Sequence, residues 1–109
     1  MVVLVLVLLI ILTMTRSLKV IIVSGNGCNR PIRSCNWYGW MEDQLKESNL
    51  FDQVILENMP DPIEAKESIW VPHIVNKFGA DENTIIIGHS SGETNCSTTN
   101  THCSTTNTH

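Results

Sequence analysis

Two kinds of hydrophobic pattern alternate along the middle of the chain: short continuous apolar runs, and longer segments with apolar residues at helical spacing. Short β-branched runs at 19–24, 53–57 and 84–87 are typical of strands buried in a parallel sheet. Between them, segments 37–47 and 61–78 carry apolar residues at helical spacing. The order β-α-β-α-β predicts an α/β fold with right-handed crossovers, whose chemistry lies at the carboxyl ends of the strands.

The first predicted helix has one apolar face and one charged face. The apolar face consists of Trp37, Trp40, Met41 and Leu45, and the charged face of Glu42, Asp43, Lys46 and Glu47. This pattern predicts that both tryptophans pack in the core.

The second predicted helix has a start signal and an internal break. Asp61 is placed to cap it, Pro62 suits the first helical position, and Glu64 completes a box-like capping pattern. Pro72 is expected to kink or break the helix. Beyond the capping residues, Trp70, Ile74 and Phe78 share one face.

The two ends of the chain differ from the middle, which gives boundaries of 1–18, 19–93 and 94–109. The run from Val2 to Leu12 is purely aliphatic, and it is shorter than the roughly 20 residues that a membrane-spanning helix needs. Three interpretations stay open: a secretory signal-like segment, an extra strand or helix, and a spurious extension of the coding sequence.

The C-terminal tail is a tandem heptad, in which residues 96–102 recur unchanged as 103–109. Its Ser, Thr and Asn residues are poor helix formers and leave little to bury, which predicts a disordered low-complexity tail. In each repeat the Cys and the His stand six positions apart, wider than usual for zinc ligands, so no metal site is expected.

Charge and cysteine content exclude two classes of protein. Seven basic residues against eleven acidic ones give a net charge of −4, which argues against an electrostatic nucleic-acid binder. Four cysteines are too few for a disulfide scaffold to be the default. Cys28 and Cys35 could pair in an oxidising compartment, and free thiols are expected in a cytosolic protein.

The strongest motif for chemistry follows the third predicted strand. Gly88-His89-Ser90-Ser91-Gly92 matches G-x-S-x-G at a strand-to-helix junction, where a sharp turn exposes the serine hydroxyl. Ser90 is therefore the candidate nucleophile, and Gly88 and Gly92 are the elbow glycines. The backbone N–H of Ser91 is a candidate oxyanion donor.

A second candidate element follows the first predicted strand. Gly25, Asn26 and Gly27 would lie beside Ser90 in a parallel sheet and could supply another oxyanion N–H. A dinucleotide fingerprint is excluded, because Arg30 stands where a third glycine is needed and Pro31 obstructs a helix. Turn formation alone is the alternative role of these glycines.

Five ordered blocks together resemble the retinoblastoma-binding protein 9 family of serine hydrolases, a branch of the α/β-hydrolase fold. They are Gly25–Gly27 with the preceding strand, Trp37–Trp40, Asn58–Pro62, Glu67–Trp70 and Thr84–Gly92. The resemblance covers about residues 19–93. It implies the N-terminal β-α-β-α-β portion of a hydrolase sheet, without a cofactor.

The resemblance also implies an enzyme that hydrolyses small esters or amides. Ser90 matches the family nucleophile, while the family's catalytic Asp and His lie beyond the matched region. The chain is therefore expected to be a truncated hydrolase, inactive as written. A non-catalytic truncated relative, either a binding module or a non-functional fragment, is the alternative.

The same resemblance bears on the binding partners and the cellular location of the protein. Some family members carry Leu-x-Cys-x-Glu before the third strand, linked to binding the retinoblastoma protein. Residues 78–82 lack that motif, so this partner is not expected. The resemblance implies a cytoplasmic protein, whereas a genuine apolar N-terminus implies secretion, or membrane association through residues 1–14.

Overall fold

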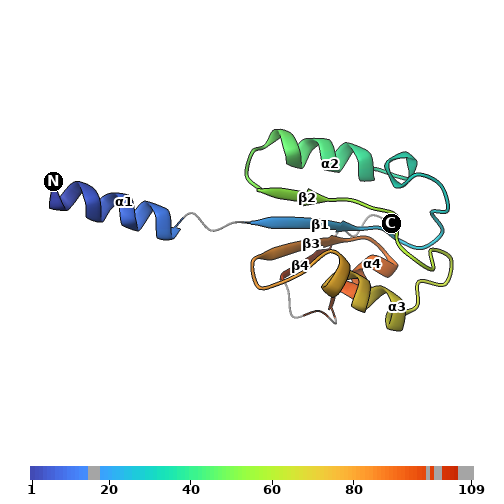
Figure 1. The fold of residues 1–109 in the computed structure, drawn as a ribbon. Coiled ribbons are helices and arrows are strands. Elements are labelled where there is room, and N and C mark those ends of the chain that lie inside the picture. Colours follow the sequence, from blue (N-terminus) through green and yellow to red (C-terminus); the bar gives the residue numbers. More distant parts are fainter. Residues whose placement is uncertain (15–17, 98, 100–101, 106–109) are drawn as a thin grey trace.

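Four parallel strands form one sheet in the computed structural model, which describes residues 1–14, 18–97, 99 and 102–105. The strand order is β2 (Gln53–Ile55), β1 (Lys19–Val23), β3 (Thr84–Gly88) and β4 (His102–Thr105), as Figure 1 shows. The expected parallel β-α-β-α-β arrangement is confirmed as part of an α/β fold.

The register of the sheet brings two strand ends together. Lys19 pairs with Gln53 and Thr84, and Val23 pairs with Gly88. Because β1 and β3 end side by side, the loops that follow them leave the sheet at the same edge. Residues 20–23 of β1 are at most 1 % exposed, as expected for a central strand flanked on both sides.

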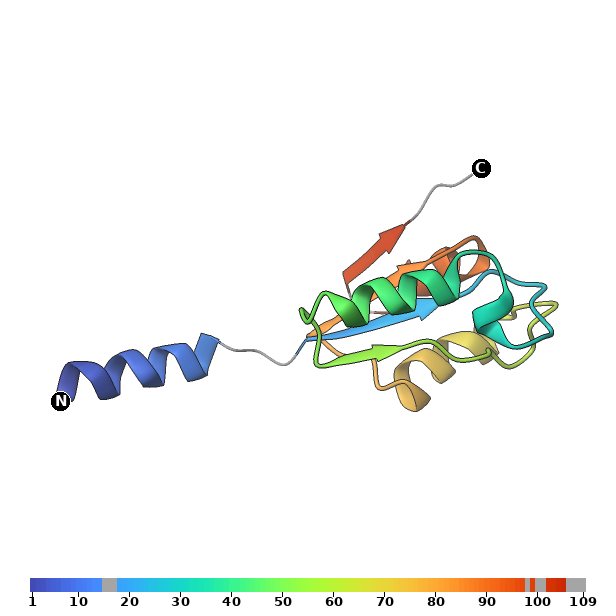
Figure 2. The ribbon, with the colours of Figure 1, turned by 90° about the horizontal axis from the view of Figure 1, so that it is seen from above.

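Helices cover both faces of the sheet (Figures 1 and 2). One face carries α2 (Tyr38–Glu47) and the short 3₁₀ turn η1 (Ile32–Ser34), with a core around Ile22. The opposite face carries α3 (Glu67–Pro72), the π-helical segment η2 (His73–Lys77) and α4 (Ser91–Ser97). Its core is built around Trp70, which is completely buried.

Helix α2 packs against the sheet through three of the four predicted apolar residues, Trp37, Met41 and Leu45, and it departs from the prediction at Trp40 and Glu42. Trp40 is 62 % exposed, so its placement in the core is wrong, while Tyr38 is 1 % exposed. Glu42, expected on the charged face, is buried and forms ion pairs with Arg33 and Lys46. Positions 38, 42 and 45 lie one above another on a helix, and the ion pairs explain how a carboxylate is tolerated there.

The second helix starts later than predicted and breaks where expected. Asp61 does not cap it; the Asp61 carboxylate accepts a hydrogen bond from the N–H of Lys66 at 3.0 Å, and α3 begins at Glu67. The chain passes from α-helix to the wider π-helical geometry directly after Pro72. Trp70, Ile74 and Phe78 are all buried, as their spacing predicts.

The aliphatic N-terminal run forms helix α1 (Val2–Met14), which lies apart from the sheet (Figure 1). The side chains from Val2 to Leu9 are exposed, each by 45 % or more. Among the described residues, no helix is long and apolar enough to cross a membrane. The three interpretations of this run stay predictions.

The expectation of disorder from residue 94 onward is wrong for the part of the tail that the structure describes. Helix α4 follows the elbow directly, and β4 extends the sheet by pairing with β3 from Ile85↔His102 to Gly88↔Thr105. Cys96 is fully buried in the core beneath α3. Burial of Asn95, Cys96 and Thr99, together with backbone hydrogen bonds between β3 and β4, orders this segment, although its composition is polar. The remaining tail residues lie outside the described residues.

Candidate functional site

Ser90 occupies a sharp turn between β3 and α4. Its φ is 56°, in the left-handed region that non-glycine residues rarely adopt, and its side chain is exposed. His89 donates its backbone N–H to the Val23 carbonyl at 3.1 Å, and Gly92 donates to the His89 carbonyl at 3.0 Å. The turn thus presents the Ser90 side chain above the end of the sheet.

The two elbow glycines are required by close backbone contacts. A Cβ atom on Gly92 would lie 2.3 Å from the Val23 carbonyl oxygen. A Cβ atom on Gly88 would lie 2.8 Å from the backbone of Glu93. Both distances are below those that real Cβ atoms show, so α4 can begin this close to β1 and β3 only with glycine at both positions.

The loop after β1 lies against the elbow, as the strand order predicts. A Cβ atom on Gly25 would lie 3.2 Å from the Ser90 Cβ. The backbone N–H of Gly25 donates to the Tyr38 hydroxyl at 2.9 Å, and that of Gly27 donates to the Pro62 carbonyl at 2.6 Å. Within the described structure, the backbone N–H of Asn26 has no hydrogen-bond acceptor. Of the three N–H groups of this loop, that of Asn26 is therefore the candidate oxyanion donor.

Side chains join the loop to the elbow and to the segment before α3. The Ser91 hydroxyl donates to Asn26 Oδ1 at 3.0 Å. The Asn26 amide Nδ2 donates to the Ile63 carbonyl at 3.2 Å. The backbone N–H of Ser91, like that of Asn26, is bonded to no group in the described residues, so the two candidate oxyanion donors belong to residues that contact each other.

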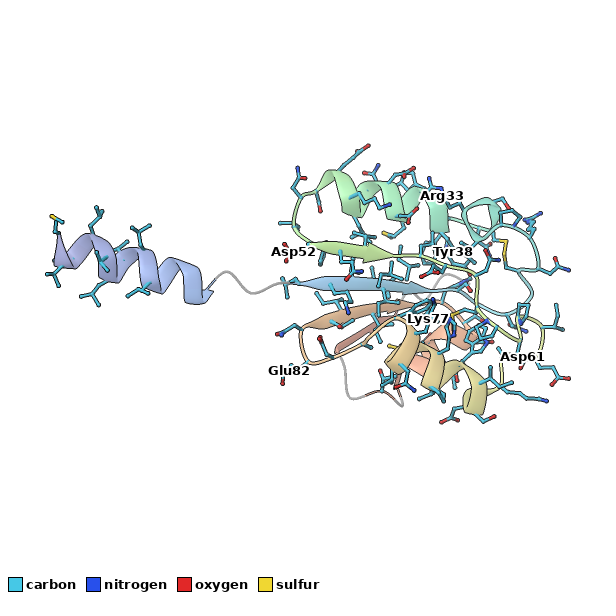
Figure 3. All side chains as sticks on the ribbon, in the orientation of Figure 1. Arg33, Tyr38, Asp52, Asp61, Lys77 and Glu82 are labelled. Atoms are coloured by element: carbon cyan, nitrogen blue, oxygen red, sulfur yellow. A yellow bond between two sulfur atoms is a disulfide. The ribbon has the colours of Figure 1, made fainter. Side chains whose placement is uncertain are left out.

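Tyr38 and His89 complete the site, although the sequence singled out neither as a functional residue. The Tyr38 Oη lies 2.7 Å from His89 Nδ1, and the Trp37 ring packs edge-on against both rings. Figure 3 labels Tyr38 where α2 begins, beside the ends of the strands. Its helical spacing with the apolar residues Met41 and Leu45 was the available signal for its burial.

A disulfide closes the loop between β1 and α2. Cys28 and Cys35 are bonded, with 6.3 Å between their Cα atoms, so the expectation of free thiols at these positions is wrong. Pro31 and the η1 turn bring the two cysteines together, which their separation of seven residues does not show. A cavity of about 370 Å³ lies beside this loop, lined by Gly25–Arg30 and by Cys35, Asn36 and Tyr38.

Residues 18–97 place no acid–base partner on the Ser90 hydroxyl. Within residues 18–97, no imidazole or carboxylate is hydrogen-bonded to it, and His89 Nδ1 is directed to Tyr38. His73 lies in η2, packed edge-on against Phe78 at 4.7 Å, and burial lowers its pKa. In the part of the chain that is described, no three His, Cys, Asp or Glu side chains gather to hold a metal ion.

No protein-family profile matches the chain. The serine hydrolase RBBP9 of Rattus norvegicus is 49 % identical over 74 residues, which cover 68 % of this chain and 39 % of the rat protein. The chain therefore spans well under half the length of the curated relative it matches. At this identity, with the matched segment amounting to two thirds of the chain, the protein is related to the RBBP9 family of serine hydrolases.

Proposed function

We propose that this chain carries the nucleophile of a serine hydrolase of the α/β-hydrolase fold, which acts on small ester or amide substrates. The observation that supports it best is the left-handed φ of 56° at an exposed serine, between glycines that admit close backbone contacts. A strained backbone of this kind is typical of positions where function requires it. Relation to a serine hydrolase supports the same reaction class.

The proposed reaction begins with attack by the Ser90 Oγ on the acyl carbon. The hydroxyl proton passes to a histidine base, and then to the leaving alcohol or amine as the acyl–oxygen or acyl–nitrogen bond breaks. The backbone N–H groups of Ser91 and Asn26 stabilise the oxyanion. Water then releases the acid and restores Ser90.

We expect the histidine base and its acidic partner to be supplied by residues outside 18–97. The matched segment is 39 % of the rat protein, and within residues 18–97 no imidazole or carboxylate is hydrogen-bonded to the Ser90 hydroxyl. A serine hydroxyl without an adjacent base is a poor nucleophile. We therefore expect the 109-residue chain to release no acid from an activated ester above background.

A chimera tests the proposal. Residues 19–92 are joined to the part of the rat hydrolase that follows its matched segment, and hydrolysis of an activated ester is measured. We expect activity that Ser90→Ala reduces by about three powers of ten or more. Ser91→Ala should retain much of it, because the backbone N–H of Ser91 remains.

Folding of the chimera is checked by circular dichroism before activity is interpreted. A folded chimera that hydrolyses no ester would contradict the proposal and favour a non-catalytic relative that acts as a binding module. Activity that survives Ser90→Ala would contradict it as well, because another residue would then be the nucleophile.

A further inference from the structure

One buried hydroxyl joins three segments of the site. The Tyr38 side chain comes from the start of α2 and is 1 % exposed. Its Oη accepts the Gly25 N–H at 2.9 Å and lies 2.7 Å from His89 Nδ1. Gly25 follows β1 and His89 follows β3, so this oxygen lies between the candidate oxyanion loop and the elbow.

The direction of these hydrogen bonds follows from the atoms involved. A backbone N–H can only donate, so the Tyr38 oxygen is the acceptor toward Gly25. The hydroxyl has one proton of its own, and His89 Nδ1 lies within reach of it. A proton on Nδ1 instead would leave the buried hydroxyl proton without that acceptor, which is costly.

We propose that Tyr38 is a positioning residue, which fixes the Gly25–Gly27 loop against the Ser90 elbow and holds His89 in the tautomer protonated at Nε2. This inference rests on the proposed role of Ser90. Because the Gly25 N–H is committed to Tyr38, the N–H of Asn26 is the donor that the loop keeps for an oxyanion.

Packing around the hydroxyl supports a fixed geometry. The ring of Trp37 lies 4.9 Å from that of Tyr38 and 5.4 Å from that of His89, edge-on in both cases. Edge-to-face arrangements at these separations are favourable. The three rings therefore restrict the orientation of the Tyr38 hydroxyl and of the His89 ring together.

Nitrogen-15 NMR of the unmodified 109-residue chain gives the first test. We expect His89 to show a non-protonated signal for Nδ1 and a protonated signal for Nε2 at neutral pH. The Gly25 amide should exchange with solvent more slowly than the Asn26 amide. A protonated Nδ1, or a Gly25 amide that exchanges as fast as that of Asn26, would overturn the proposal.

Tyr38→Phe gives the second test, because it removes the hydroxyl and keeps the ring. We expect Gly25 amide exchange to rise by about tenfold, as for loss of one hydrogen bond, and His89 to populate both tautomers. The backbone amides of Asn26 and Ser91 should shift. Trp40→Phe is the matched control, since it changes an exposed ring of the same helix and should alter none of these signals.

Two results would contradict the positioning role even if the variant folds normally. One is an unchanged His89 tautomer in Tyr38→Phe, and the other is unchanged Asn26 and Ser91 amide signals. If the variant does not fold, the spectra of the unmodified chain still decide the proposal. None of these measurements involves acylation, so failure of Ser90 as a nucleophile would be seen separately, in the chimera.

Discussion

Ser90 adopts a backbone conformation that lowers the stability of the fold. A serine in the left-handed region has its Cβ too close to the backbone, which costs roughly 1–2 kcal/mol. The conformation persists because neighbouring backbone contacts determine it, with Gly92 packed against the end of β1. Exposure of the hydroxyl follows directly from this strained turn.

Replacing Ser90 with glycine should therefore stabilise the fold relative to alanine. Glycine adopts positive φ without strain, whereas alanine keeps the Cβ. We expect Ser90→Gly to unfold with a free energy about 1 kcal/mol higher than Ser90→Ala in urea titrations. Equal values for the two variants would show that the left-handed turn is absent in solution.

Residue spacing alone predicted part of this site. The G-x-S-x-G pattern after an aliphatic run identified Ser90 and its glycines, because the turn needs those residue types. Tyr38 and His89 were not singled out for a role, since their contact joins positions 51 residues apart. The choice of Asn26 over Gly25 and Gly27 also depends on hydrogen bonds that only the folded chain shows.

Helices and strands were predicted well where their apolar pattern was clear. They were predicted poorly where polar contacts determine which residues are buried or ordered. The three strands from the β-branched runs are observed, and Pro72 ends α3 as expected. The predicted apolar face of α2 is confirmed for Trp37, Met41 and Leu45. It is wrong for Trp40, which faces solvent, and Glu42 of the predicted charged face is buried because ion pairs stabilise its carboxylate. The order of β4 depends on its pairing with β3, and that of α4 on burial of Cys96 in the core, neither of which composition reveals.

The disulfide between Cys28 and Cys35 is expected to stabilise the loop between β1 and α2. Closing a loop of this size lowers the entropy of the unfolded chain by an amount worth about 2 kcal/mol. The double variant Cys28→Ser/Cys35→Ser should lose about that much unfolding free energy in urea. An unchanged urea midpoint under oxidising conditions would show that the two sulfurs are not bonded in solution.

His73 is expected to make the stability of η2 depend on pH. Burial lowers the pKa of His73. The charge of Glu57 opposes this effect by raising the pKa, and the charge of Lys77 lowers it further. The unfolded chain therefore binds a proton at higher pH than the folded chain does. Stability is full above about pH 6.5, the ordinary histidine value, and falls as pH decreases through the lowered pKa of the folded state.

Urea unfolding at pH 7.5 and 5.5 measures this dependence. The unmodified chain should lose more stability between these two values than His73→Gln, which is similar in size and does not titrate. The same loss in both proteins would show that other groups cause the pH dependence.

The whole molecule is a three-layer sandwich whose helical cover is uneven. On the side that carries α2, Ile85 and Ile87 of β3 are only partly buried, whereas Ile86 on the opposite side is fully buried. Helix α1 adds further exposed apolar surface, apart from the sheet (Figure 2). Exposed apolar surface on this scale favours self-association.

Removing residues 1–17 should therefore change association without changing the fold. We expect the shortened chain to elute as a smaller species in size-exclusion chromatography with light scattering, and to keep its thermal midpoint. Leu4→Lys/Leu8→Lys is a control of full length that should act in the same direction. A clearly lower midpoint after the deletion would mean that α1 packs on the domain.

The central claim is that the elbow makes Ser90 the reactive serine. It is tested most directly by treating the chimera of residues 19–92 and the remainder of the rat hydrolase with a fluorophosphonate, then locating the adduct by mass spectrometry. The account predicts an adduct on Ser90 that is lost in Ser90→Ala and retained in Ser91→Ala. An adduct on Ser91, or no adduct in a folded chimera, would contradict it.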